Sequence, residues 1–467
     1  MDFPALFARQ QAHFHAEVKF HTPARRRKKL ERLKEAFLNR RQQIYDASLA
    51  DLNRGPMETE VTDFLPVLLE ITHAIKHMES WAKPTPRSGG MLMIGTSAYT
   101  YPEPKGVAYI IAPWNFPIML ALNPVISAVA AGNCFILKPS ELAPHSSVLL
   151  KSLLAEVFSE EEAAVVEGDG AVAAELSKLP FDHVFFTGST TVGKMVMRAA
   201  AEHLTPVTLE LGGVNPAVVD KSADLRDTAE KVVWSKLYNC GQACVSVNDL
   251  WVHTSVHDDL MGEIEAAMVR MYGPLRDIQD NPDYCRIVHP RHVARIEKIR
   301  QETVAAGGKE IVGAAADAAN RFVPPVVIDQ APFASAAFQE EIFGPVLAVK
   351  TWEDESQLWQ SLRSRPKPLS AYAFTRSERF FERFLANVSS GSTCLNEVVL
   401  QFAHLELPFG GIGASGMGRA HGQAGFMAFS NERSVLRQRT GLTNGKLFYP
   451  PYKDSFVKIL EWVDRYL

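Results

Sequence analysis

The sequence has few cysteines, no strong excess of charge of either sign and no apolar leader segment. Its five cysteines are odd in number and too few for a disulfide framework, so a reducing compartment is expected. The formal charge of −4, from 49 Lys and Arg against 53 Asp and Glu, excludes the strongly basic footprint of a nucleic-acid-binding protein. The N-terminus lacks the basic and apolar regions of a signal peptide, which predicts a cytoplasmic location.

The sequence also lacks the patterns of a zinc site and of a membrane span. Cys240 and Cys244 have neither the spacing nor the histidine partners of a zinc ligand set, so no metal site is expected. Residues 106–137 carry no charged side chain and are long enough to cross a bilayer. Pro113 and Pro124, with other prolines, asparagines and a glycine, interrupt this stretch, and lipid could not satisfy the irregular backbone that results. Buried strand, loop and helix are therefore expected.

From residue 106 onward, short apolar runs alternate with helical segments. Strands alternating with helices predict an α/β fold with parallel βαβ units, which bind ligands at the carboxyl ends of their strands. A second α/β region follows Gly213. The expected strands are 106–112, 134–137, 163–166, 183–186 and 250–253, and the expected helices are 124–131, 146–157, 172–179, 225–237 and 257–271.

Residues 185–194 combine a strand end, a glycine turn and a helix start. The first turn of such a helix offers free backbone N–H groups and a positive dipole end to a phosphate. The segment also contains the GxxxxGK pattern of a nucleotide-triphosphate phosphate loop. Met195 then stands where such a loop has a Ser or Thr for Mg²⁺, which counts against an ATPase or kinase. A plain glycine-containing helix start is the alternative.

Cys244 and Glu210 are the candidates for covalent and acid–base chemistry. Cys244 follows Gly241 and Gln242 in a connection that suits an accessible thiol, although a cysteine more often serves as a small buried hydrophobe. Glu210 lies within an apolar strand just before two glycines. A buried carboxylate is either functional or held in a salt bridge, so both interpretations stay open.

Polar side chains also follow two of the expected parallel strands. Asn115, in the loop after the first strand, offers an amide to a developing oxyanion, or serves only to make a turn. Lys138 and Glu141 come at the end of the next strand. They either hold the ribose of a nucleotide in the crevice or pair with each other.

Seven motifs along the chain together resemble the aldehyde dehydrogenase superfamily, and within it the short class 3 group of fatty and aromatic aldehyde dehydrogenases. The resemblance covers nearly the whole chain, and it includes SGMG at 415–418 and YPPY at 449–452, which are similar to class 3. One departure is Val214, where the family usually has Lys. The seven motifs, in the family's order, are PWNFP (113–117), KPSE (138–141), FTGSTTVG (186–193), LELGG (209–213), GQAC (241–244), EEIFGP (340–345) and LPFGG (407–411).

The resemblance implies three parts of the fold. A Rossmann-like parallel-sheet NAD(P)-binding domain would comprise residues 1–84, 104–210 and about 415–435. A second α/β domain, the catalytic one, would comprise 211–414, and a small bridging and oligomerisation arm with the C-terminal tail would comprise 85–103 and 436–467. 

The resemblance also implies the roles of the site residues. Cys244 would be the nucleophile, Glu210 the general base and Asn115 the oxyanion donor, joined by the Cys244 backbone N–H. Cys240 stands where only some members have cysteine, and it raises the prospect of an oxidative disulfide with Cys244. The residues implied to bind the cofactor are Trp114, Lys138, Glu141, Gly188, Ser189, Val192, Gly193, Glu341 and Phe343.

The implied activity is the oxidation of an aldehyde to its carboxylic acid with NAD⁺, or with NADP⁺, through a cysteine thiohemiacetal and a thioester that water hydrolyses. Two alternatives stay open: a CoA-acylating semialdehyde dehydrogenase, whose relatives tend to lack the base, and a non-catalytic member of the fold. The implied partners are an aldehyde and a second copy in a homodimer. No membrane anchor is expected, because Phe456, Ile459, Leu460 and Val463 have the spacing of an amphipathic helix.

Overall fold

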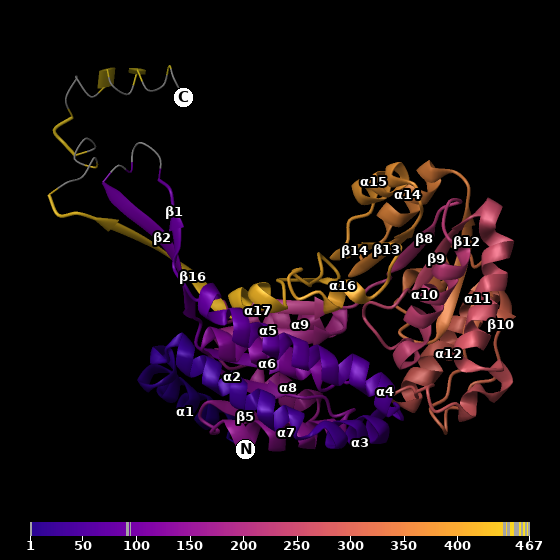
Figure 1. Ribbon diagram of the computed structural model, residues 1–467, viewed down its shortest axis with the longest axis horizontal. Coiled ribbons are helices and arrows are strands. Elements are labelled where there is room, and N and C mark those ends of the chain that lie inside the picture. The colour runs from indigo at the N-terminus through magenta and orange to yellow at the C-terminus, as the bar shows by residue number, and fades with distance from the viewer. Residues whose placement is uncertain are drawn as a thin grey trace.

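The computed structural model of the protein contains three β-sheets, and helices flank the two larger ones (Figure 1). It describes residues 2–89, 93, 95–441, 445, 449–452, 457, 458, 461, 462 and 465. The apolar positions of the expected C-terminal helix, Phe456, Ile459, Leu460 and Val463, lie outside the described residues. Among the helices that are described, none is long and apolar enough to cross a membrane.

The first sheet has six strands, and five of them run parallel in the order β7-β6-β3-β4-β5. A short strand, β15 (Gly416–Met417), pairs antiparallel with the β7 edge. The parallel strands are β3 (Val107–Ile111), β4 (Cys134–Lys138), β5 (Ala163–Val165), β6 (His183–Gly188) and β7 (Val207–Leu211), and the helices between them are α6 (Met119–Ala131), α7 (Pro144–Val157), α8 (Gly170–Leu176) and α9 (Thr190–Ala201).

Both faces of this sheet are buried. Along β3, Ala108 and Ile110 belong to one hydrophobic cluster, whereas Val107, Tyr109 and Ile111 belong to another on the opposite face. This alternation follows from the two-residue period of a strand, and a sheet covered on both faces explains why its strands are continuously apolar in the sequence. The predicted parallel βαβ units are confirmed.

Helix α6 begins earlier than predicted. The predicted helix covers residues 124–131. The helix instead begins at Met119 and keeps Pro124 inside. Leu122 and Val125, on either side of this proline, are fully buried. We attribute the longer helix to this burial, which outweighs the hydrogen bond that the proline cannot donate.

The second sheet has seven strands in the order β10-β11-β12-β9-β8-β13-β14, all parallel except β10. Helices α10 (Leu225–Leu237) and α11 (His257–Tyr272) confirm the two helices predicted in this region. Further helices here are α12 (Pro290–Ala305), α14 (Glu355–Ser364) and α15 (Glu378–Asn387). The strands are β8 (Pro216–Val219), β9 (Asp249–His253), β10 (Lys309–Val312), β11 (Val326–Asp329), β12 (Val346–Trp352), β13 (Ser370–Phe374) and β14 (Ser392–Leu395).

The third sheet projects from the body of the molecule as an arm (Figure 1). It consists of β1 (Thr85–Arg87), β2 (Thr96–Pro104) and β16 (Ser430–Gln438). β16 pairs with β2 along its whole length, so residues 430–435, predicted for the cofactor domain, lie in a strand of this sheet. The reason is that β2 continues to Pro104, and its backbone offers pairing partners as far as Ser430. The other domain limits stay predictions.

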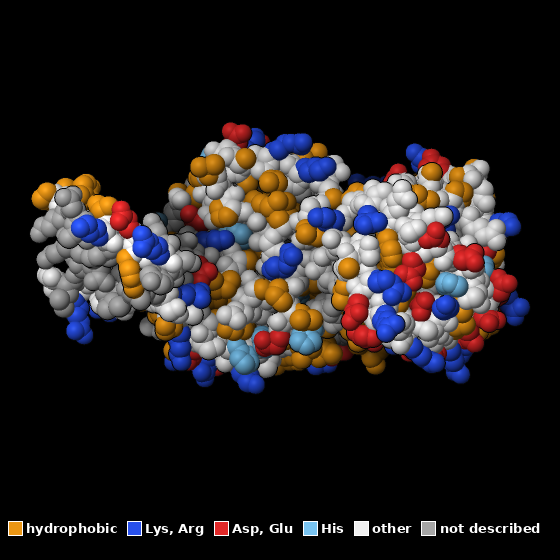
Figure 2. All heavy atoms as spheres, turned by 90° about the horizontal axis from the view of Figure 1, so that it is seen from above, with side chains coloured by type: hydrophobic (Ala, Val, Ile, Leu, Met, Phe, Trp, Pro, Cys, Tyr) orange, Lys and Arg blue, Asp and Glu red, His pale blue; other side chains and the backbone are white. Residues whose placement is uncertain are grey.

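Five N-terminal helices precede the arm. No strand lies between them in the described residues 3–81. They are α1 (Phe3–Ala16), α2 (Pro23–Leu38), α3 (Arg41–Leu52), α4 (Pro56–Thr59) and α5 (Leu65–Trp81). Leu30, Leu33 and Phe37 of α2, at helical spacing, are buried together with Ile71 of α5 against α6. In the face drawn in Figure 2, basic and acidic side chains intermingle over the domain at the right, as the small net charge leads one to expect.

Candidate active site

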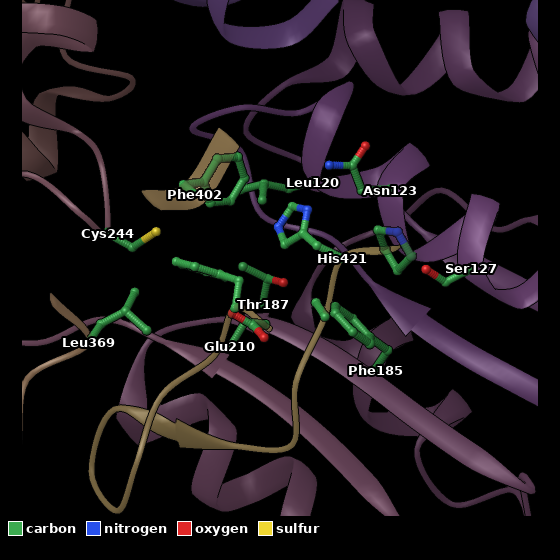
Figure 3. A pocket seen from close by; sticks show the side chains of 13 residues that line it. Leu120, Asn123, Ser127, Phe185, Thr187, Glu210, Cys244, Leu369, Phe402 and His421 are labelled. Atoms are coloured by element: carbon green, nitrogen blue, oxygen red, sulfur yellow. The ribbon is translucent and has the colours of Figure 1, made fainter. Parts of the chain in front are cut away.

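A cavity lies where the carboxyl edge of the six-stranded sheet faces loops that adjoin the seven-stranded sheet. Thr187 of β6 and Glu210 of β7 line it from one side, and Cys244 and Leu369 from the other. Figure 3 shows the Cys244 sulfur and the Glu210 carboxylate pointing into the same space. The structure thus brings together two of the three predicted catalytic residues, which lie in separate segments of the sequence.

The backbone before Cys244 has an unusual conformation. Asn239, Cys240 and Gly241 all have positive φ, of 47°, 52° and 72°. A side chain at Gly241 would clash with the carbonyl oxygen of Gly344, so the close approach requires glycine. This sharp reversal lets the loop turn from the end of α10 towards the cavity, and it places the partly exposed Cys244 at the cavity surface.

Hydrogen bonds from the second domain hold the Cys244 loop. The Asn215 side-chain amide donates to the carbonyl oxygens of Cys244, at 2.7 Å, and of Ser246, at 3.0 Å. The Tyr372 hydroxyl donates to the carbonyl oxygen of Val245 at 2.5 Å. The backbone on both sides of the thiol is therefore anchored to the seven-stranded sheet.

Asn115, which follows β3 of the six-stranded sheet, is hydrogen-bonded to the same loop. Its side-chain amide donates to the carbonyl oxygen of Gln242 at 3.1 Å. Its own carbonyl oxygen accepts from the Asn239 amide at 2.9 Å and from the Arg54 guanidinium at 3.1 Å. Asn115 is 4% exposed, so it is a buried member of this network and more than a turn residue. The third predicted catalytic residue is thus joined to the loop two residues before Cys244.

Glu210 is buried without a partner. Neither of its carboxylate oxygens accepts a hydrogen bond from a described residue. Burial raises the pKa of Glu210 to about 8, although the positive charge of Arg419 acts against this rise. The salt-bridged interpretation is therefore wrong for the described part of the chain. A carboxyl group with such a pKa can exchange protons near neutral pH.

The Cys244 thiol is protonated in this arrangement. Burial raises its pKa to about 12, and the negative charges of Glu341 and Glu210 add to this effect. The thiolate is the nucleophilic form of cysteine, so the site needs a base or an added positive charge to generate it. The Glu210 carboxylate lines the same cavity as this thiol.

The start of α9 offers a binding surface for phosphate. Ser189 is the N-cap, and its hydroxyl accepts from the Val192 N–H at 3.4 Å. A Cβ at Gly193 would lie 2.7 Å from a methyl group of Leu211, so glycine here lets the helix approach β7 closely. Gly188, Ser189 and Val192 are not buried, and the helix start remains open to a ligand. This arrangement fits the pyrophosphate of a dinucleotide.

Lys138 and Glu141 meet at the neighbouring strand end. The Lys138 ammonium lies 2.9 Å from a carboxylate oxygen of Glu141. The lysine side chain is 4% exposed and the glutamate 43% exposed. The two residues pair with each other, as one of the two interpretations predicted, and the exposed acid remains accessible to ribose hydroxyls.

Glu341 and Phe343 lie beside the glycine pair that follows Glu210. A Cβ at Gly212 would clash with the Glu341 carboxylate, and the Gly213 N–H donates to that carboxylate. Burial raises the pKa of Glu341 to about 7, and its Oε1 has no hydrogen-bond partner among the described residues. Such an oxygen suits a ribose hydroxyl. Phe343, at a φ of 48°, stands edge-on to Trp114 with ring centroids 5.5 Å apart.

Some residues that build the site were missed from the sequence. Arg54, in the connection between α3 and α4, and Asp63, in the helical turn before α5, form a fully buried ion pair behind Asn115, and no local sequence pattern marks them. Asn215 stands in a segment that drew attention only for Val214. His421 lines the cavity, with Nδ1 3.2 Å from a carboxylate oxygen of Glu70.

The predicted disulfide partner of Cys244 has other neighbours. Cys240 is fully buried, and its sulfur lies 4.0 Å from the carbonyl oxygen of Val323. Its thiol also interacts with that of Cys285, and all five cysteines are free thiols. A disulfide between Cys240 and Cys244 therefore stays a prediction.

A larger cavity leads from Cys244 towards the surface beside α5. It encloses about 1080 Å³ including its open mouth. Most of its lining is apolar, and polar side chains such as Asn123 and His421 are the minority. The side-chain Oδ1 of Asn123 is buried without a partner among the described residues. Residues that form the apolar wall include Phe116, Met119, Leu120, Trp234, Phe402 and Leu405.

The chain is similar in sequence to known proteins. A sequence model described as "Aldehyde dehydrogenase family" matches residues 2–435. The chain is 38% identical to 4,4'-diaponeurosporen-aldehyde dehydrogenase of Staphylococcus aureus, over 92% of this chain and 93% of that protein. It is 36% identical to aldehyde dehydrogenase family 3 member A2 of Mus musculus, over 92% of this chain and 88% of that protein. It is also 36% identical to a probable coniferyl aldehyde dehydrogenase of Pseudomonas aeruginosa, over 98% and 95% of the two chains.

Solved structures are similar as well. The substrate-bound state of Staphylococcus aureus AldH has a TM-score of 0.94 and 36% identity, and the match covers 99% of this chain and 100% of that chain. Mycobacterium tuberculosis aldehyde dehydrogenase complexed with NAD⁺ has a TM-score of 0.86 and 26% identity, and the match covers 95% and 91% of the two chains.

Proposed function

The chain belongs to the aldehyde dehydrogenase family and is an NAD(P)-dependent aldehyde dehydrogenase, and we propose that Cys244, Glu210 and Asn115 carry out its reaction on an apolar aldehyde. One observation supports these roles above all others. The thiol of Cys244 and the unpartnered carboxylate of Glu210 face one cavity, and Asn115 is tied to the loop that carries the thiol.

The reaction begins with activation of the thiol. Ionised Glu210 accepts the proton of Cys244, which also removes one of the negative charges that raise the pKa of the thiol. The thiolate adds to the aldehyde carbonyl and gives a thiohemiacetal. The Asn115 amide and the Cys244 backbone N–H donate hydrogen bonds to the oxyanion that forms, in a buried setting where such bonds are strong.

The next step needs a hydride acceptor, which NAD⁺ or NADP⁺ supplies when bound, and it leaves an acyl thioester on Cys244. For this cofactor, the chain offers residues Gly188, Ser189, Val192 and Gly193 at the start of α9 for the pyrophosphate. Lys138 and Glu141 would bind the adenosine ribose, and Glu341 would bind the nicotinamide ribose through its unpartnered oxygen. Trp114 and Phe343 flank that end of the site.

Hydrolysis of the thioester completes the reaction. Glu210 removes a proton from the attacking water and so favours release of the carboxylic acid over transfer to coenzyme A. The buried, unpartnered state of this carboxylate supports hydrolysis, because a group without a catalytic task would cost stability at this position.

The apolar wall of the large cavity supports an apolar aldehyde as substrate. The test is a series of straight-chain and aromatic aldehydes, followed by the absorbance of the reduced cofactor, with and without coenzyme A. Each methylene that enters the cavity is expected to lower KM about fourfold, which corresponds to about 0.8 kcal/mol. A strict requirement for coenzyme A, or a preference for short polar aldehydes, would contradict the proposal.

We also propose that the protein is a cytoplasmic homodimer with the predicted cofactor and catalytic domains. The projecting arm supports a dimer, because its strands expose apolar side chains such as Leu436, at 60%, and Tyr101, at 39%. Analytical ultracentrifugation tests the dimer, and cell fractionation tests the location.

A further inference from the structure

Two histidines and a glutamate converge outside the active site. His73 and His77 lie one helical turn apart on α5. Glu406 lies in the loop after α16 (Leu400–Ala403) and faces both of them. One ligand atom from each of the three residues lies within 4.8 Å of the other two, and His73 Nε2 is 3.2 Å from Glu406 Oε1.

The spacing of the histidines is that of a chelating pair. Side chains four residues apart on a helix lie on the same face, and two imidazoles so placed can bind one metal ion. The ring centroids of His73 and His77 are 4.5 Å apart, and Trp81 packs against both rings, at 5.5 and 6.1 Å. The helix and the indole therefore hold both imidazoles in place before any ligand arrives.

An ion pair alone does not account for the cluster. The contact between His73 and Glu406 involves one imidazole only, whereas the ligand atoms of His73, His77 and Glu406 all converge. A neutral imidazole is the form that binds metal. Glu406 is 69% exposed and is free to turn its carboxylate towards the two rings.

The cluster lies next to the mouth of the apolar cavity. Leu405, the neighbour of Glu406, lines that cavity, as do Pro66 and Leu69 of α5. A Cβ at Gly422 would lie 3.3 Å from His73 Nε2 and would clash with the Leu405 carbonyl oxygen, so these three residues are closely packed. A ligand shared by α5 and residue 406 would join two walls of the mouth.

We propose that His73, His77 and Glu406 bind one divalent transition-metal ion, best represented by Zn²⁺, and that this ion fastens the 404–406 loop to α5. Two imidazoles and one carboxylate form a three-ligand zinc set that leaves a fourth, tetrahedral position for water. The sequence suggested no metal site because Glu406 follows His77 by more than three hundred residues, so no motif spacing reveals it. The proposal does not depend on the proposed catalytic roles.

The test uses the untagged full-length chain carrying Cys244→Ala, because a reactive thiol could itself bind zinc. Isothermal titration with Zn²⁺ is expected to show one site per chain. Replacement of Zn²⁺ by Co²⁺ is expected to give the visible absorption of a tetrahedral ion. His77→Ala and Glu406→Gln, both on the molecular surface, are expected to weaken Zn²⁺ binding tenfold or more. His15→Ala, which changes an exposed histidine of α1, is the matched control and should bind as the parent does.

Hydrogen exchange tests the effect on the loop. Zn²⁺ is expected to slow amide exchange in the segment 400–408 of the parent and to leave it unchanged in Glu406→Gln. Zinc binding of equal strength in parent and both variants, or no binding by the parent, would overturn the site. Binding without slower exchange would overturn the fastening of the loop.

Discussion

The two sides of the Cys244 loop differ in how their polar groups are satisfied. On the cavity side, Glu210 and Glu341 carry buried oxygens without a described partner, next to the Cys244 thiol; we call these three residues the reactive face. Behind the loop, the polar groups of Arg54, Asn115, Asn215, Asn239 and Gln242 hydrogen-bond to one another or to the backbone; we call these five the supporting network.

The difference shows that buried polar groups without partners and buried polar groups with partners have different roles. An unsatisfied buried group costs free energy, so it persists where a ligand completes it. A satisfied network fixes geometry and contributes to stability. Changes in the reactive face should therefore remove activity and leave stability unchanged or improved, whereas changes in the network should lower stability first. Asn115 belongs to the network and also points its amide at the loop, so it connects the two sides.

The largest expected effect is that of Cys244→Ala. This change should abolish dehydrogenase activity, because no covalent intermediate can form, while cofactor binding and Tm stay close to wild type. Steady-state kinetics, titration of the cofactor by fluorescence and thermal melts measure the three properties. Cys394→Ala, at a partly exposed cysteine away from the cavity, is the control and should keep most activity. Near wild-type turnover in Cys244→Ala would show that Cys244 is not the nucleophile.

Glu210→Gln comes next, with a loss of roughly 10² to 10⁴ in the hydrolytic step. Hydride transfer precedes hydrolysis, so a variant that still forms the thiolate should give a burst of reduced cofactor and then slow turnover. Intact-mass spectrometry should find the acyl group on Cys244. If Glu210 also generates the thiolate, the burst itself slows and higher pH restores it. Wild-type turnover in this variant would show that Glu210 is not the base.

Arg54→Met tests the supporting network. It leaves Asp63 buried without its cation, and the expected loss is about 3 to 5 kcal/mol in the free energy of unfolding. Denaturant melts measure this loss. The double change Arg54→Met with Asp63→Leu should recover part of the stability, because no uncompensated charge remains. A stable Arg54→Met protein with activity as low as Glu210→Gln would break the distinction between the two sides.

The pH dependence gives a smaller effect on the reactive face. Burial raises the pKa of Glu210 to about 8, so the carboxyl is mostly protonated at pH 7 and gains its basic form as the pH rises. The rate of thioester hydrolysis should therefore rise between pH 6 and about 8, by up to tenfold per pH unit, and then level off. Single-turnover measurements isolate this step. A rate that is constant over the range would contradict the raised pKa.

The smallest effect concerns the choice of cofactor. NAD⁺ should be preferred over NADP⁺, because Glu141 accepts hydrogen bonds from ribose hydroxyls but repels a 2′-phosphate, while Lys138 compensates in part. Glu141→Gln should narrow the preference, and Tm should change little because the glutamine side-chain oxygen can still accept a hydrogen bond from Lys138. The ratio of kcat/KM for the two cofactors is the measurement. A wild-type enzyme more efficient with NADP⁺ would contradict the assignment.

Local patterns predicted most of the elements that carry the site. Helix α10 begins and ends at the predicted residues. Glu210 lies within a strand, β7, as predicted. Hydrophobic period and glycine position act over a few residues, so the sequence alone reveals them. The start of α6 was missed because burial around Pro124 outweighs local preference.

The sequence by itself determined the alternation of strands and helices, the glycine turn at the start of α9 and the family to which its motifs point. Only the tertiary structure decided that Glu210 has no described partner, that Arg54 stands behind Asn115, and that Glu406 meets His73 and His77. The physical reason is the distance along the chain over which each effect acts. Propensity and period act between near neighbours along the chain, whereas the partner of a buried charge comes from whichever distant segment the packing of two domains brings to it.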